Sequence, residues 1–122
     1  MVLVDTSVWI NHLRNSNKYL EKLLFDGEVV CHTYIIGELA CGNLKNHKEI
    51  ISLFQSLPTV TVVEFREYLY FIEKNQLSAK GLGFVDIHLL ASAKLNQVPL
   101  WTADKKLEVA ATELDLSYKR KI

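Results

Sequence analysis

Short apolar runs alternate with amphipathic segments along the whole chain. Runs rich in β-branched residues predict buried strands at 2–4, 28–31, 59–63 and 100–102, with a last short strand expected at 117–122. Between them, apolar residues recur at helical spacing, which predicts helices at 7–14, 17–25, 34–42, 46–57, 66–77, 84–96 and 104–114. This alternation is typical of a parallel sheet that helices cover on both faces. We therefore predict an α/β fold: a three-layer α/β/α arrangement around a mainly parallel sheet of four to five strands.

Composition and charge narrow the possible functions. A chain of 122 residues predicts one domain over 1–122. Because 14 basic and 14 acidic residues balance, binding to a polyanion would need a local basic surface. Cys31 and Cys41 form no C-x-x-C pair, so both are expected to be free thiols. The opening MVLVD does not look like a secretion signal and no stretch is long enough to span a membrane, so we expect a cytoplasmic protein without a membrane partner.

Four acidic residues stand at positions that this fold would bring to one edge of the sheet. Asp5 follows the first strand and Asp104 follows the strand at 100–102, and parallel strands end on the same edge. Asp86 lies in the first turn of an apolar helix that starts near that edge, and Glu38 lies beside the apolar stripe of its helix. Taken singly, Asp5 and Asp104 are also good helix caps, and Glu38 is an ordinary surface residue. Only their joint placement favours a functional site.

Carboxylates that converge in this way repel one another and raise each other's pKa. A hard divalent cation relieves that repulsion, and Mg²⁺ or Mn²⁺ prefers ligands that are carboxylate oxygens and waters. Such an ion activates a water and offsets charge on a phosphodiester. The sequence has no Walker A lysine motif and no G-x-S-x-G motif. Metal-assisted hydrolysis is therefore the chemistry that these residues favour.

Four sequence segments carry a family resemblance: V-L-V-D-T-S-V-W-I, I-I-G-E-L, F-V-D-I-H-L-L-A-S-A and L-W-T-A-D-K-K-L. In order and spacing they resemble PIN-domain proteins, and the whole chain resembles a small bacterial PIN ribonuclease of the VapC toxin type. The resemblance implies an endoribonuclease that uses Mg²⁺ or Mn²⁺ to cleave RNA, forms a homodimer and is held inactive by a cognate antitoxin. We expect the antitoxin to contact the apolar face of the helix at 17–25, which consists of Tyr19, Leu20, Leu23 and Leu24.

The resemblance also assigns roles to individual residues. It maps the acids of the family to Asp5, Glu38, Asp86 and Asp104. The three aspartates are expected to hold one metal ion, while the glutamate assists a second ion or orients the attacking water. The small hydroxyl positions of the family map to Thr6 or Ser7 and to Thr102. Many relatives carry a further acid two residues after the third one; here that residue is His88, which is expected to support the site or contact substrate.

Two other functions remain open at this point. One is a catalytically inactive PIN-like module that binds RNA or protein. The other is a phosphoaccepting α/β signalling domain, which also uses Mg²⁺ and acids at strand ends. A signalling domain calls for clustered acids at the first strand and a lysine at a late strand end. Asp5 has no adjacent acid, and the late strand ends in Thr102.

Overall fold

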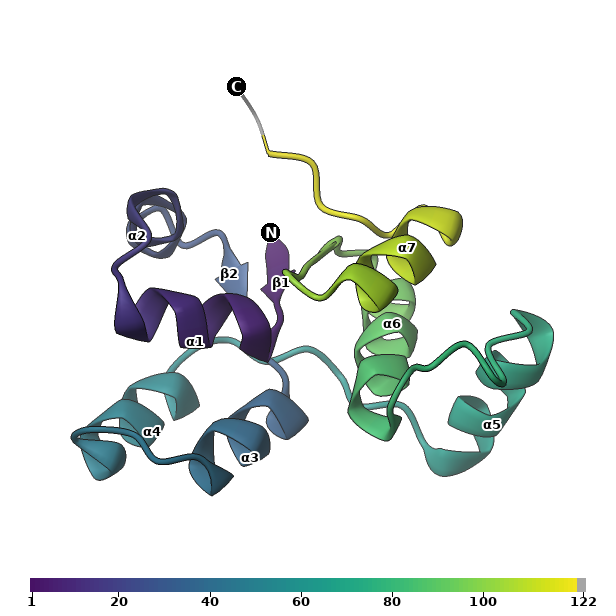
Figure 1. Cartoon of the computed structure of the whole chain (residues 1–122), viewed down its shortest axis with the longest axis horizontal. Coiled ribbons are helices and arrows are strands. Elements are labelled where there is room, and N and C mark those ends of the chain that lie inside the picture. The colour runs from purple at the N-terminus through teal and green to yellow at the C-terminus, as the bar shows by residue number, and fades with distance from the viewer. Residues whose placement is uncertain (121–122) are drawn as a thin grey trace.

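The computed structural model describes residues 1–120, in which seven helices surround a short sheet (Figure 1). The elements in chain order are β1 (Val2–Val4), α1 (Thr6–Arg14), α2 (Lys18–Phe25), β2 (Val29–Val30), α3 (Thr33–Cys41), α4 (His47–Gln55), α5 (Phe65–Lys74), α6 (Phe84–Asn96), β3 (Leu100–Trp101) and α7 (Lys105–Glu113). No helix in this part of the chain is long and apolar enough to cross a membrane.

The sheet is parallel and has the strand order β2-β1-β3. Leu3 of the central strand pairs with Val30 on one side and with Leu100 on the other. All residues of β1 are buried, as expected for a strand with helices on both sides. Figure 1 shows the strands in the middle of the molecule, with α1 to α4 in one half and α5 to α7 in the other. This parallel sheet flanked by helices confirms the predicted α/β class.

The prediction of four to five strands is wrong for the described residues, where the sheet has three strands. In the segment at 59–63 only Thr59 pairs, through a single bridge to Cys31. The backbone N–H of Thr61 points instead to the Asn96 side chain of α6, at 3.4 Å, so this segment follows α6 and leaves the sheet. At the other edge a single bridge joins Ser117 to β3. The last two residues of that expected strand lie outside the described residues.

Side chains from the sheet and from several helices pack into one hydrophobic core. Leu3, Ile35, Leu89 and Leu107, which come from a strand and three helices, are fully buried. Helix α6 is buried along seven consecutive residues, Ile87 to Ala93, and therefore shows no single apolar stripe. Burial of each large apolar side chain contributes about 1.5–3 kcal/mol. A helix held this firmly gives the acid in its first turn a fixed position.

A histidine side chain caps the start of α3. His32 is the N-cap, and its Nδ1 accepts the backbone N–H of Tyr34 at 3.0 Å. Because Nδ1 is an acceptor, Nε2 carries the proton and donates to the hydroxyl of Ser92, 3.0 Å away. His32 is completely buried, and this burial lowers its pKa to about 4. The neutral imidazole thus ties α3 to α6.

Helix α2 packs its apolar face into the protein. Leu20 is fully buried, and Leu23 and Leu24 are half-buried against the core. The ring of Tyr19 stands edge-on to Trp101 of β3, with 5.7 Å between the ring centroids. Much of this face therefore packs against the chain's own core, and only Tyr19, Leu23 and Leu24 stay partly exposed. Antitoxin binding at this face stays a prediction.

Candidate active site

Asp5 follows β1 directly and is buried, with 6% of its surface exposed. It is the N-cap residue of α1, yet its side chain makes no capping hydrogen bond. Its Oδ2 instead accepts two hydroxyl hydrogen bonds, from Ser7 at 2.7 Å and from Thr102 at 2.8 Å. The helix-capping interpretation therefore fails for this side chain. Two neutral hydroxyl groups therefore fix the buried Asp5 carboxylate, and neither supplies a positive charge to balance it.

Thr102 connects Asp5 to a second acid. Its side chain is 7% exposed, and its Oγ1 donates to Asp5 while accepting the backbone N–H of Asp104 at 3.0 Å. Asp104 is exposed and caps α7, because its Oδ1 accepts the backbone N–H of Leu107 at 3.1 Å. Capping thus uses one oxygen of this carboxylate. The parallel pairing of β1 and β3 brings the two acids to the same edge.

Asp86 is half-buried in the first turn of α6. Its Oδ2 accepts the backbone N–H of Gly83 at 2.9 Å. The sequence analysis missed this donor, although the spacing from Gly83 to Asp86 is that of a capping box. The pKa of Asp86 is raised, mainly by burial and further by the negative charges of Asp5 and Asp104, while the Gly83 hydrogen bond opposes the shift. Asp86 therefore lies within electrostatic reach of both other aspartates.

Glu38 reaches the same place from α3. Its Oε1 accepts the hydroxyl hydrogen bond of Thr6 at 2.7 Å, so α1 positions this acid as well. Partial burial of its carboxyl group raises the pKa of Glu38, the Thr6 hydrogen bond lowers it, and the charges of Asp5 and Asp86 raise it. Asp5, Glu38 and Asp86 thus act on one another electrostatically, and Asp104 acts on Asp86. Hydroxyl groups of Thr6, Ser7 and Thr102 bind the acids in this region.

The four carboxylates have no cationic partner within the described residues. Ion pairs in residues 1–120 join the amino terminus to Glu28, Lys22 to Asp26 and Lys80 to Glu113, all elsewhere. The hydrogen bonds described above use one oxygen of each carboxylate. A set of hard oxygen donors that carries uncompensated negative charge fits a divalent cation such as Mg²⁺ or Mn²⁺.

The acids are near one another without forming a finished coordination shell. Across residues 1–120, no three acidic, histidine or cysteine side chains already stand in a metal-holding arrangement. Each carboxylate is turned toward its hydrogen-bond donor.

His88 lies in an aromatic cluster formed by side chains of α3, α5 and α6. It is 2% exposed; its ring stacks on Tyr68 with 4.2 Å between centroids, and Tyr34 packs edge-on against it at 4.8 Å. Its Nδ1 is buried, and no described residue forms a hydrogen bond with it. Burial lowers the pKa of His88. The neutral ring of His88 packs against Phe84, the first residue of the same helix, which also carries Asp86.

Comparisons with known proteins agree with this architecture. A family model described as the PIN domain matches residues 2–113. Ribonuclease VapC32 from the Mycobacterium tuberculosis strains CDC 1551 and H37Rv is 43% identical over 114 residues, which are 93% of this chain and 92% of that protein. The crystal structure of PAE2754 from Pyrobaculum aerophilum superposes with a TM-score of 0.60 over 89% of this chain and 84% of that chain; at 17% identity it supports the fold alone. The chain belongs to the PIN domain family.

Proposed function

We propose that this protein is an endoribonuclease that hydrolyses phosphodiester bonds in RNA with the help of Mg²⁺ or Mn²⁺. The observation that carries the proposal is the set of four carboxylates that gather at one edge of the sheet without a cationic partner in the described residues. Negative charge concentrated in this way repels the phosphate that is to be cleaved unless a cation stands between them. The similarity to a protein named as a ribonuclease supports RNA as the substrate.

Each acid has a role that follows from its surroundings. Asp5, Asp86 and Asp104 would hold the cation, which when bound would activate a water and offset the negative charge that develops on the phosphate. Glu38 uses Oε1 for the Thr6 hydrogen bond, so Oε2 is free to orient the attacking water and to accept its proton. The raised pKa of Glu38 suits a proton acceptor that works near neutral pH.

The hydroxyl side chains have positioning roles in this proposal. Ser7 and Thr102 fix Asp5, and Thr102 also fixes the backbone of Asp104. Thr6 fixes Glu38. His88 supports the first turn of α6 through packing and takes no part as a ligand.

We further propose that the protein is the toxin of a toxin–antitoxin pair and that the antitoxin occupies a groove beside Glu38. This groove has a volume of about 610 Å³ and lies between α1, α3 and the segment before α4. Its apolar lining includes Ile10, Leu13, Leu39, Leu44 and Ile50. A peptide segment in the groove would end at Glu38 and could block the acids directly.

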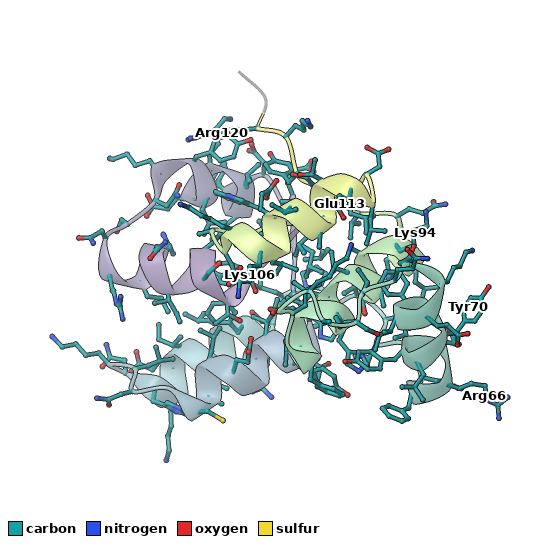
Figure 2. All side chains as sticks on the ribbon, turned by 45° about the vertical axis from the view of Figure 1, so that its right-hand side comes forward. Arg66, Tyr70, Lys94, Lys106, Glu113 and Arg120 are labelled. Atoms are coloured by element: carbon teal, nitrogen blue, oxygen red, sulfur yellow. The ribbon has the colours of Figure 1, made fainter. Side chains whose placement is uncertain are left out.

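A homodimer through α5 completes the proposal, with the whole of 1–122 acting as one cytoplasmic PIN domain. Phe65, Leu69 and Tyr70 are 62%, 50% and 62% exposed, which is unusual for apolar side chains on a short helix. Figure 2 shows Tyr70 and Arg66 extending from α5 into solvent. Leu69→Glu should convert a dimer into a monomer in light scattering; an unchanged mass would place the dimer contact elsewhere.

The experiment that tests the function is RNA cleavage by the protein freed of any partner. We expect cleavage with Mn²⁺, none in EDTA, and a loss of at least about 100-fold in Asp86→Asn. Asp115→Asn is the matched control, because Asp115 is exposed and its positive φ of 58° suits asparagine. Cleavage that survives EDTA, or that Asp86→Asn leaves unchanged, would contradict the proposal. RNA binding without cleavage would favour the inactive PIN-like module.

A further inference from the structure

A basic cleft lies beside the acids, between α7 and the loop at 78–83. It has a volume of about 390 Å³ and is lined by Lys80, Lys105, Lys106, Val109, Ala110 and Glu113. Both of its walls begin at acids of the candidate site: α7 starts directly after Asp104, and the loop leads to Gly83, whose N–H binds Asp86. The walls of the cleft are therefore joined through the backbone to two acids of the candidate site, although no acid of that site lines the cleft.

Lys106 is held across this loop by contact with Gly81. A Cβ atom at Gly81 would lie 2.9 Å from Nζ, 3.1 Å from Cδ and 3.4 Å from Cε of Lys106. The lysine stem thus lies flat on the loop backbone in space that a larger residue would occupy. Gly81 also has a φ of +74°, which disfavours any residue with a side chain. Figure 2 shows Lys106 near the start of α7 and Glu113 at its other end.

Two lysines of the cleft, Lys105 and Lys106, have no acidic partner within residues 1–120. Lys105 and Lys106 are the first two residues of α7, where the helix dipole favours acids and disfavours cations. Lys80 pairs with Glu113 at 3.4 Å, whereas Lys105 and Lys106 have no ion pair within residues 1–120. Unfavourable lysines at a helix start are the kind of local exception that a ligand explains.

We propose that Lys106, positioned by Gly81, binds the backbone phosphate of RNA next to the phosphate that is cleaved. The inference rests on the proposed function and deepens it by naming the path of the strand. Lys106 is two residues beyond Asp104, and a two-residue step reaches at most about 7 Å, which suits a neighbouring phosphate. A chain without net charge must concentrate its cations in such a place to hold RNA.

The first test compares Lys106→Gln with Lys94→Gln, an exposed lysine of α6 that does not line the cleft and that Figure 2 shows apart from Lys106. The probe is a fluorescein-labelled single-stranded RNA of random sequence, titrated in EDTA at several salt concentrations. We expect Lys106→Gln to weaken binding roughly fivefold to tenfold and to reduce the slope of log K against log salt by about 0.7, while Lys106→Arg retains both. Lys94→Gln should change neither.

The second test separates the Gly81 contact from backbone strain. Gly81→Ala and Gly27→Ala both place a side chain at positive φ, +74° and +69°, but nothing lies within 4 Å of a Cβ at Gly27. Both variants should lose comparable thermal stability. Only Gly81→Ala should also weaken RNA binding, because only there is a lysine displaced.

Cleavage kinetics show whether Lys106 binds the cleaved phosphate or a neighbouring one. Lys106→Gln should raise KM with little change in kcat, since a contact to a neighbouring phosphate is made equally before and during the reaction. A lower kcat at unchanged KM would place Lys106 at the cleaved phosphate and contradict the assignment. Wild-type affinity and slope in Lys106→Gln, or equal RNA affinity in the two glycine variants, would overturn the proposal. A Lys106→Gln variant that loses antitoxin binding but keeps its RNA affinity would also overturn the proposal. A wild-type protein with no RNA affinity in the presence of Mn²⁺ would contradict the proposed function itself.

Discussion

Thr102→Val tests the hydrogen-bond network beneath the acids with almost no change in side-chain volume. The variant removes one buried hydrogen bond to the Asp5 carboxylate and one from the backbone N–H of Asp104. A bond to a charged group contributes about 1.5–3 kcal/mol and a neutral one about 0.5–1.5 kcal/mol. We therefore expect the free energy of unfolding to fall by about 2–4.5 kcal/mol, which lowers the melting temperature by roughly 8–18 °C.

The same variant should weaken Mn²⁺ binding by about 10-fold to 100-fold, because a group that orients a ligand is lost while every carboxylate remains. Urea denaturation in EDTA measures the stability, and calorimetric titration measures the affinity. Thr102→Ser is the control: it keeps Oγ1 and loses one methyl group, at a cost of about 1 kcal/mol. If Thr102→Val matches Thr102→Ser in both assays, the network does not hold the acids.

Three further predictions follow from capping and from the pKa shifts. Asp104→Asn keeps the α7 cap and should abolish cleavage at unchanged stability, whereas Asp104→Ala should also lose about 1 kcal/mol of stability in urea denaturation; equal cleavage by Asp104→Asn and wild type would leave capping as the only role. Since the pKa of His32 is lowered to about 4, the folded protein binds fewer protons than the unfolded chain below pH about 6.5. Its free energy of unfolding should fall by about 1.4 kcal/mol per pH unit from there toward pH 4, and His32→Asn should flatten that slope. The raised pKa values of Asp86 and Glu38 act with opposite sign: their stability contribution is present below the ordinary carboxyl pKa and is lost as pH rises through the raised values. In the His32→Asn background, Mn²⁺ should cancel that loss of stability. The same free energy of unfolding with and without Mn²⁺ across this pH range would refute the reasoning.

The positions of Asp5 and Asp104 could be predicted because the topology of the sheet determines them. Asp5 and Asp104 each follow a strand, and parallel strands must end on one edge. Asp86 stood out because a carboxylate in an otherwise apolar helix needs a reason to be there. The hydroxyl positions followed only from the family resemblance, since their hydrogen bonds depend on how two strand ends meet.

Other features depend on tertiary contacts that periodicity does not contain. The β-branched run at 59–63 has strand character, yet it leaves the sheet after Thr59 because Asn96 of α6 binds the backbone at Thr61. The apolar face of α2 is partly covered by the chain's own core, with Leu20 fully buried, and this depth of burial could not be predicted from the sequence. The contact between Gly81 and Lys106 depends on the path of a loop and was likewise beyond prediction.

The central claim is that four acids, distant in sequence, act together as one divalent-cation site. Isothermal titration of Mn²⁺ into the partner-free protein tests it most directly, with Asp5→Asn as the variant and Asp115→Asn as the matched control. We predict saturable binding by the wild type and by Asp115→Asn, and its loss in Asp5→Asn although that variant remains folded. Undiminished Mn²⁺ binding by Asp5→Asn, or no binding by the wild type, would contradict the account.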